Sequence, residues 1–174
     1  GRKLSNNLFK CIDEILPYNR WDQIARIAVA TGPGGFTGTR ITIAMSRTIA
    51  QQLGCNLDGI SSFKLMAQRL SIKLKSDESN KSFWITKDLK RRGLIGGKYK
   101  IASDEFTPYC YRVIELTSPY LLPNDCKVSP IIEANEDLAK DTRELMKISS
   151  SFHDLKKVAS WEKVLPIYPT SPVE

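Results

Sequence analysis

The sequence predicts an α/β fold, and three features of the chain lead to that prediction. First, the apolar run Ile27–Ala30 is typical of a buried strand, and a glycine-rich loop follows it. Second, a helical pattern runs from about Thr39 to Leu53, and Gly54 is placed where a left-handed residue would close the helix. Third, short aromatic and β-branched runs in the second half of the chain are typical of strands.

The first helix is expected to begin near Ser5, whose hydroxyl can cap it, and to stop at Pro17. Its apolar side chains recur with helical spacing at Leu8, Ile12, Ile15 and Leu16. An apolar stripe of this kind has to be buried against another element.

The loop between the strand and the next helix contains Gly32, Pro33, Gly34, Gly35, Phe36, Thr37, Gly38 and Arg40. Glycine lets backbone N–H groups approach a ligand, and a helix N-terminus favours anions. However, the loop has no lysine, as a Walker loop requires, and its third glycine comes one residue late for the dinucleotide fingerprint. Two interpretations stay open, an anion-binding loop and a turn that lets the helix pack close to its sheet. Arg40 at the helix start opposes the helix dipole, which indicates an anion or carboxylate partner there.

The helix that follows the loop is apolar on more than one side. One stripe contains Ile41, Ala44, Met45, Ile49 and Leu53, whereas Ile43 and Ala50 lie off that stripe. Such a helix is either buried on both sides or keeps one side for a partner. A third helix is expected at about residues 62–70, with Phe63, Leu65, Met66 and Leu70 as its apolar residues.

Two lobes are expected, residues 1–72 and residues 82–174, joined by a charged linker at residues 73–81. In the second lobe, the glycine pair Gly96-Gly97 is expected in a hairpin or loop between the first two strands. The expected strands are Phe83–Ile85, Lys98–Ile101 and Tyr109–Val113, followed by a helix at Asn135–Ile148 and an extended proline-rich tail.

Composition indicates an ordinary globular protein, with 174 residues of which 41% are apolar. No stretch approaches the roughly 20 apolar residues that cross a bilayer, and no secretory signal opens the chain, so we expect a cytoplasmic protein without a membrane partner. The four cysteines lack a Cys-x-x-Cys pair and are expected to be reduced and mostly packed: Cys11, Cys55, Cys110 and Cys126.

A net charge of +7 indicates an acidic partner, of which RNA is the natural candidate. The cations concentrate in one stretch near Trp84 and Tyr99, and those expected to contact RNA are Lys87, Lys90, Arg91 and Arg92, with Lys98 and Lys100 close by. Aromatic side chains beside cations suit stacked bases and phosphates. The alternative interpretation is a solvated charged face with strand aromatics that point inward.

Catalytic patterns are scarce in this chain. His153 is the single histidine, so a two-histidine metal site cannot form, and no Gly-x-Ser-x-Gly elbow accompanies it. The paired carboxylates Asp13-Glu14 and Asp104-Glu105 are adjacent in sequence and therefore point in different directions. We expect no catalytic residue and no metal site in this chain.

Over its whole length, the segment Thr31–Arg40 resembles the Gly-Pro-Gly-(Ser/Gly)-Phe-Thr-Gly-x-Arg signature of the bacterial TsaB family, also called YeaZ. The resemblance continues upstream over Leu4–Leu16 and downstream through Leu53–Gly54 to Gly59–Ser62. Near the other end, Trp161–Tyr168 is similar to the Leu-Pro-x-Tyr ending of the family. The resemblance spans nearly the entire chain, strongly over residues 1–70 and weakly between the two ends.

The chain departs from the family pattern at two places. Family members carry a β-hairpin region with an Asp-Thr-Ser-like strand ahead of the first helix, and this chain begins at Gly1 without it, so we expect an N-terminally truncated version of the fold. In the middle, Asp88–Gly93 matches the family's Asp-Ala-Arg-(Arg/x)-Gly-Glu-Val-Tyr only loosely, and Leu94 replaces the acidic residue after the glycine.

The resemblance implies the two-lobe ASKHA fold shared by actin, Hsp70 and ribonuclease H. It also implies a non-catalytic scaffold that supports N6-threonylcarbamoyladenosine synthesis in tRNAs that read codons beginning with A. Its partners would be a catalytic TsaD-like subunit and a small TsaE-like ATPase, with a homodimer in competition and tRNA as the substrate of the complex. No cofactor is expected on this chain, because ATP and metal would belong to the partner subunits.

In that family the first two helices dock against the equivalent helices of the catalytic subunit. Here the docking residues would be Leu8, Cys11, Ile12, Ile15, Ile41, Ala44, Met45, Thr48 and Gln52. Two alternatives from other classes stay open, an independent nucleotide-binding protein and a peptidase-like protein of the same superfamily.

Overall fold

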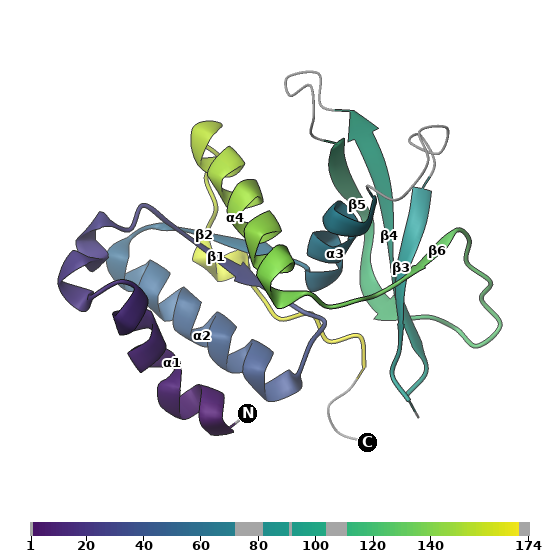
Figure 1. Cartoon of the computed structure of the whole chain (residues 1–174), viewed down its shortest axis with the longest axis horizontal. Helices are drawn as coiled ribbons and strands as arrows, with labels where there is room; N and C mark the ends of the chain where they lie inside the picture. Colours follow the sequence, from purple (N-terminus) through teal and green to yellow (C-terminus); the bar gives the residue numbers. More distant parts are fainter. Residues whose placement is uncertain (1, 72–81, 91, 104–110, 171–174) are drawn as a thin grey trace. The chain divides into compact units, whose positions relative to one another are not determined.

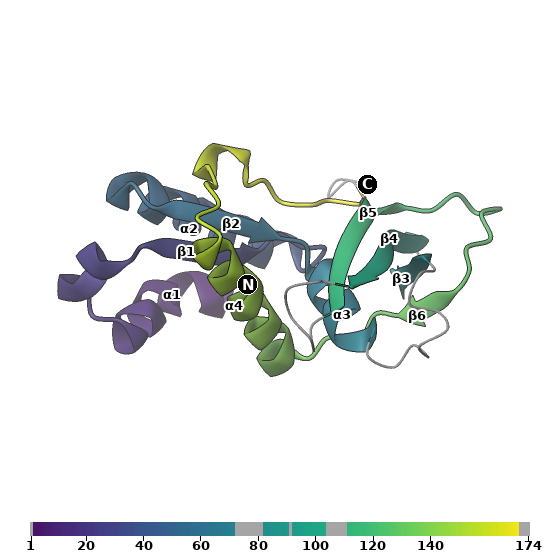
Figure 2. The ribbon, with the colours of Figure 1, turned by 90° about the horizontal axis from the view of Figure 1, so that it is seen from above.

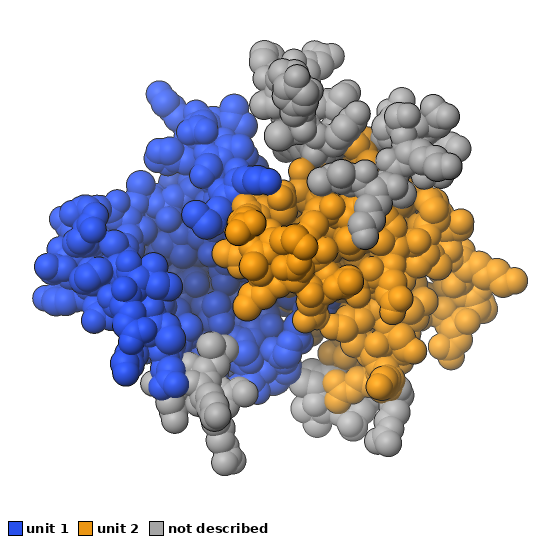
Figure 3. Space-filling model, in the orientation of Figure 1, with its two compact units in different colours: residues 1–60, 145–166 blue, residues 61–144, 167–174 orange. Residues whose placement is uncertain are grey.

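The computed structural model has a mixed α/β fold, shown in Figure 1, and describes residues 2–71, 82–90, 92–103 and 111–170. The chain divides into two compact units, which Figure 3 colours separately. Unit 1 comprises residues 1–60 and 145–166, and unit 2 comprises residues 61–144 and 167–174. This division differs from the expected lobes 1–72 and 82–174, because a C-terminal segment returns to unit 1. The expected linker at residues 73–81 lies outside the described residues.

Unit 1 is built on a strand–helix–strand motif. Strands β1 (Arg26–Ala30) and β2 (Asn56–Ile60) pair in parallel, and helix α2 (Phe36–Leu53) connects them. Parallel neighbours need such a crossover, since a tight turn cannot reverse the chain twice. Helix α1 (Arg2–Ile15) and the short 3-10 helix η1 (Tyr18–Gln23) precede the motif.

The two helices of unit 1 begin earlier than the sequence predicts. Helix α1 starts at Arg2, so Ser5 lies inside the helix and is not its cap. Helix α2 starts at Phe36 instead of Thr39, because the carbonyl of Gly35 already accepts the N–H of Thr39 at 2.9 Å. The predicted end of α2 is confirmed: Gly54 adopts φ 62° and its N–H bonds back to the last turn.

The core of unit 1 joins both ends of the chain. It contains Val29, Ile43, Ala50 and Leu57, together with Val164 from the C-terminal segment. That segment includes the 3-10 helix η4 (Trp161–Lys163). Gly59 is needed here, since a Cβ at this position would lie 2.8 Å from a methyl carbon of Val164.

Unit 2 contains a four-stranded sheet in the order β5-β4-β3-β6, which Figure 2 shows from above. Its strands are β3 (Ser82–Asp88), β4 (Leu94–Ser103), β5 (Tyr111–Leu121) and β6 (Ile131–Glu133). Neighbours are antiparallel except β3 and β6, which are parallel. Helix α3 (Ser62–Leu70) packs on one face, and the core there contains Phe63, Met66, Phe83, Ile85, Ile95, Tyr99 and Val113.

The prediction of a turn at Gly96-Gly97 is wrong. Both glycines lie inside β4, opposite Thr86 and Ile85 of β3. The turn instead closes at Gly93, which has φ 97° and whose carbonyl accepts the N–H of Leu89 at 3.0 Å. Gly97 is a glycine for packing reasons, because a Cβ there would lie 2.7 Å from the hydroxyl oxygen of Tyr99.

Helix α4 (Leu138–Asp154) is displaced from the predicted Asn135–Ile148. Residues before it stay extended, since the Ala134 N–H donates to the carbonyl of Thr86 at 2.7 Å and the guanidinium of Arg69 donates to the carbonyl of Asn135. The first turns of α4 belong to unit 2, and the remainder belongs to unit 1.

The prediction that the cysteines are mostly packed holds for Cys55 and is wrong for two others. Cys55 is half-buried against the core of unit 1, whereas Cys11 and Cys126 are exposed free thiols. Cys110 lies outside the described residues.

Candidate functional site

The glycine loop is anchored in unit 1 at its first residues. The N–H of Thr31 donates to the carbonyl of Ile60 at 2.8 Å, and Thr31, Gly32 and Pro33 are buried. Gly32 adopts φ 95°, a conformation that favours glycine. The first half of the loop therefore positions α2 against β2.

The second half of the loop is exposed and leads into α2. Gly34 and Gly35 face solvent, and a Cβ on Gly35 would meet nothing within 4 Å. Gly35 is the N-cap, and no side chain caps the helix. Thr37 and Gly38 belong to the first helical turn and not to the loop, because the helix begins at Phe36.

Arg40 does not lie at the helix start as the sequence predicts. It lies in the second turn, and its guanidinium carbon is 5.2 Å from the ring centroid of Phe36. A cation above an aromatic ring is a favourable contact on its own. The inferred anion partner for Arg40 is therefore not needed to explain its position.

Helix α1 presents apolar side chains that unit 1 does not bury. Among the predicted docking residues, Leu8 and Ile12 are half-buried, whereas Cys11 is exposed and Ile15 is 84% exposed. Phe9, which the sequence analysis left out of the docking set, is 62% exposed. Packing within the unit thus uses the middle of the apolar stripe and leaves both flanks open.

Helix α2, which contacts α1, presents an exposed stripe of small and polar residues. Ala44, Thr48 and Gln52 recur along the helix with a spacing of four and are all exposed, while Ile41 and Met45 are half-buried. The hydroxyl of Thr48 donates to the carbonyl of Ala44 at 3.0 Å. Because that hydroxyl is already paired, burying it under a partner would leave no unpaired donor.

A buried ion pair joins β1 and β2, and its further partners come from α4 and the segment that follows it. Arg26 Nη1 lies 2.6 Å from Asp58 Oδ1, and the two side chains are 7% and 2% exposed. Ser149 Oγ donates to the other carboxylate oxygen at 2.7 Å, and Arg26 Nη2 donates to the carbonyl of Lys157. The sequence analysis missed this network, because the predicted strand Ile27–Ala30 excluded Arg26 and the strand that contains Asp58 was not predicted.

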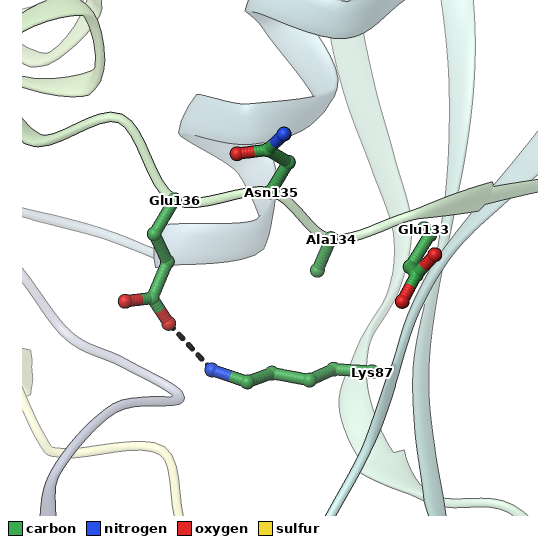
Figure 4. Close-up of a pocket in the computed structure, with 5 residues that line it drawn as sticks. All are labelled: Lys87, Glu133, Ala134, Asn135 and Glu136. Carbon is green, nitrogen blue, oxygen red and sulfur yellow. Dashed lines mark hydrogen bonds and ion pairs between the residues drawn. The ribbon is translucent and has the colours of Figure 1, made fainter.

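The predicted RNA contacts lie in unit 2, around the β3–β4 turn. Lys87 is paired with Glu136, at 2.5 Å between Nζ and Oε1, while Lys90 and Arg92 are exposed. Arg91 lies outside the described residues. A small cavity of about 410 Å³ borders Lys87 and residues 133–136, and Figure 4 shows the ion pair across it. Lys87, the cation that lines this cavity, is thus already neutralised by Glu136.

The two aromatic residues singled out with these cations have different environments. Tyr99 is fully buried, so it cannot stack on a base. Burial, reinforced by the carboxylate of Glu115, raises the pKa of Tyr99 well above its usual range. Trp84 is half-buried on the opposite face of the sheet, with Lys98 Nζ 5.9 Å from its ring centroid.

Among the described residues, no three His, Cys, Asp or Glu side chains lie close enough together to hold a metal ion. His153 is exposed near the end of α4. Within the same described ranges, no helix is both long enough and apolar enough to cross a membrane.

Comparison with known proteins gives one family and a set of similar folds. A family model described as "TsaD: tRNA N6-adenosine threonylcarbamoyltransferase" matches residues 1–106. No curated protein sequence matches the chain.

Two solved structures from Pseudomonas aeruginosa share the fold at 18% sequence identity. One is described as an uncharacterized protein with similarity to peptidase YEAZ, with a TM-score of 0.64 over 95% of this chain and 83% of that chain. The other is described as YeaZ, with a TM-score of 0.61 over 94% of this chain and 85% of that chain. These similarities confirm the predicted α/β fold of the ASKHA class.

Proposed function

Since the matched model covers more than half of the chain, this protein belongs to the TsaD family of tRNA-modifying proteins as a YeaZ-like member, and we propose that it is a non-catalytic scaffold subunit. In this role it supports N6-threonylcarbamoyladenosine synthesis on tRNAs that read codons beginning with A. It acts by docking α1 and α2 against the catalytic TsaD-like subunit in the cytoplasm. The observation that supports this best is the exposed apolar flank of α1 beside a contacting helix with an exposed small-residue stripe.

The chemistry of the two helices suits a helix bundle with a partner. Ile15 is 84% exposed, and burying such a side chain fully contributes about 1.5–3 kcal/mol. Ala44 and Thr48 are small enough for the axis of a second helix to approach within about 8–10 Å. Ridges-into-grooves packing needs a bulky apolar side chain, such as Ile15, and a groove formed by small residues, such as Ala44 and Thr48.

The proposal places the remaining chemistry on other subunits. A TsaE-like ATPase would join the complex, tRNA would be its substrate, and ATP and metal would be held by the partners. A homodimer through the same helices would compete with the heterodimer, because an unpaired apolar face also fits a second copy of itself.

The test is titration calorimetry of this protein against the purified catalytic subunit, with charge substitutions on the docking face. Ile15→Asp should weaken binding by about 30-fold or more, the loss typical of an interface hot spot. Leu138→Asp is the matched control, since Leu138 is 85% exposed at the start of α4 and belongs to unit 2. Ile12 is a poorer choice because it is half-buried and its substitution would also perturb the fold.

A second pair of variants tests α2. Ala44→Asp should weaken binding as Ile15→Asp does, whereas Ala139→Asp, at an exposed alanine of α4, should leave binding unchanged. Equal binding by all four variants, each with a wild-type melting curve, would remove the scaffold proposal in this form.

The nucleotide-binding alternative has less support. Thr31, Gly32 and Pro33 are buried, so only Gly34 and Gly35 of the loop face solvent. Saturable binding of labelled ATP by the isolated protein, lost in a Gly35→Asp variant, would favour this alternative. The peptidase alternative would need cleavage of a peptide by the pure protein.

A further inference from the structure

The sheet of unit 2 has one covered face and one open face. Residues that point to α3, such as Phe83, Tyr99 and Val113, are fully buried. On the opposite face, within the described part of unit 2, no helix covers the strands. Six side chains define this open face: Trp84, Lys98, Lys100, Ile114, Tyr120 and Ile131.

The strand register places these six residues side by side. Trp84 of β3 is opposite Lys98 of β4 and Ile131 of β6. On the other side of β4, Lys100 is opposite Ile114, and Tyr120 is opposite Gly96. Three of the side chains are markedly exposed: Ile114 at 41%, Tyr120 at 37% and Ile131 at 51%.

Two aromatic rings form the centre of the open face. The centroids of Trp84 and Tyr120 are 6.4 Å apart, and their planes are inclined by 59°. Gly96 makes room for Leu122 and Trp84, since a Cβ there would lie 2.8 Å from Cδ1 of Leu122 and 3.3 Å from Cε3 of Trp84. A glycine in a central strand is otherwise unfavourable, and here it lets Leu122 and the Trp84 ring pack against the backbone of β4.

The two lysines of the open face lie toward one end of it, whereas the register places the exposed carboxylates of Asp88 and Glu133 toward the β3–β4 turn. Lys98 lies over the ring of Trp84, and neither Lys98 nor Lys100 makes an ion pair there. The exposed Lys90 and Arg92 lie in the β3–β4 turn, beyond Asp88. Glu115 is turned away, because its carboxylate lies 3.4 Å from the buried hydroxyl of Tyr99.

We propose that the open face binds unpaired nucleotides of an RNA, with bases stacked on Tyr120 and Trp84 and phosphates paired with Lys98 and Lys100. Aromatic rings flanked by unpaired cations on an open sheet are suited to single-stranded nucleic acid, because every base offers a ring to stack and every linkage a negative charge. A double helix would not fit, since its bases are already stacked and paired. This inference does not depend on α1 and α2, so it can fail or hold independently of the scaffold role.

The experiment measures binding of the full chain to a labelled RNA stem-loop and to a blunt RNA duplex, without any partner subunit. Tyr120→Ala should weaken stem-loop binding by about 5- to 150-fold, the range for losing one stacked base. Tyr120→Phe should stay close to wild type, because stacking needs the ring and not the hydroxyl. Tyr18→Ala is the control, since Tyr18 is 77% exposed in unit 1.

The salt dependence tests the lysines. Lys98→Gln and Lys100→Gln should each reduce the slope of log affinity against log salt by about 1, whereas Lys163→Gln in η4 should not change it. Equal affinity for duplex and stem-loop, or equal losses in Tyr120→Ala and Tyr18→Ala, would overturn the proposal. So would no saturable binding by folded wild-type protein, or a homodimer that Tyr120→Ala dissociates without any RNA affinity, because a second copy would then be the occupant.

Discussion

Single residues decide how closely the parts of each unit pack, and Tyr99 is the clearest case. Its ring is fully buried between β4 and α3, and its hydroxyl lies 3.4 Å from a carboxylate oxygen of Glu115. Burial raises the pKa of Tyr99, so the phenol keeps its proton at any ordinary pH. Gly97 provides the space that this large side chain needs.

The Gly97→Ala substitution should therefore destabilise the protein. The added Cβ would lie 2.7 Å from the Tyr99 hydroxyl oxygen, and the fully buried ring has no free space to move into. Overpacking of this kind costs about 1–3 kcal/mol. Urea unfolding of the two proteins measures the difference. Gly35→Ser serves as the control, since nothing lies within 4 Å of that position and serine also caps a helix, and a loss as large as that of Gly97→Ala would contradict the packing argument.

The cysteines should differ in reactivity because they differ in environment. Burial raises the pKa of the Cys55 thiol, so a smaller fraction of it is thiolate at a given pH. Cys11 and Cys126 are exposed. Alkylation at mildly alkaline pH, mapped by mass spectrometry of peptides, should modify Cys11 and Cys126 first and Cys55 only slowly. Rapid modification of Cys55 in the folded protein would contradict its placement, and denaturant should make the three rates similar.

At the scale of elements, the caps explain which helices the sequence predicts well. The span predicted for α3, residues 62–70, is confirmed, because Ser61 is a strong cap whose hydroxyl oxygen accepts the N–H of Lys64. The cap of α4 is Asp137, whose carboxylate accepts the N–H of Lys140 at 3.1 Å. The sequence could not show that the carbonyl of Asn135 accepts a hydrogen bond from Arg69 of α3 and that Asn135 therefore lies outside the helix.

Because the α4 cap is a charged carboxylate, its contribution to stability should depend on pH. Hydrogen bonds from the side chain and backbone of Lys140 lower the pKa of Asp137 below its ordinary value of 3.8. A lowered pKa in the folded state gives stability that is present above that ordinary value and is lost as pH falls below it. Asp137→Asn keeps an amide cap but removes the charge, so its melting temperature should be lower than wild type at neutral pH.

The difference between Asp137→Asn and wild type should shrink as the pH falls below about 3.8, in thermal scans followed by circular dichroism. Ser61→Ala, which removes an uncharged cap, provides the comparison because its effect should not follow this pH dependence. If the melting temperatures of Asp137→Asn and wild type differed equally at acid and neutral pH, the effect of the cap would come from its hydrogen-bond geometry and not from its charge.

At the scale of the whole molecule, local sequence patterns predicted most of the helices and strands but not how they assemble. The run Ile27–Ala30 and the glycine at position 54 act within a few residues, so the sequence displays them directly. Strand β2 was missed because its five residues include an aspartate and a glycine, which disguise a buried strand. The return of residues 145–166 to unit 1 depends on contacts that span more than 90 positions, and no local pattern encodes these.

The candidate site was predictable to a similar degree. The family resemblance identified Ile15 and Ala44 as docking candidates, and both are exposed on helices that contact each other. Spacing could not distinguish the half-buried Leu8 and Ile12 from the exposed residues of the same stripe, because that depends on where α2 covers α1. Nor could it reveal that Tyr120 lies beside Trp84, which requires the register of three strands.

The Arg26–Asp58 pair should be the interaction on which unit 1 depends most, because it joins β1 and β2 to the C-terminal segment. Asp58→Leu would leave the Arg26 guanidinium buried without its counter-ion and remove the acceptor of Ser149. Removing one partner of a buried pair costs about 3–5 kcal/mol, a large share of the roughly 5–15 kcal/mol by which a domain is stable. Urea unfolding should show this loss, and Asp88→Leu, at an exposed position of β3, should show little.

The double variant Arg26→Met with Asp58→Leu separates the cost of a lone charge from the value of the pair. Two apolar side chains in place of the ions remove the uncompensated guanidinium, so the double variant should be more stable than Asp58→Leu alone. Arg26 Nε, which is buried and has no hydrogen-bond partner among the described residues, would also disappear. If the double variant were instead less stable than the single one, the guanidinium would have to be stabilised by its remaining bond to the Lys157 carbonyl, and that turn would be the real anchor of unit 1.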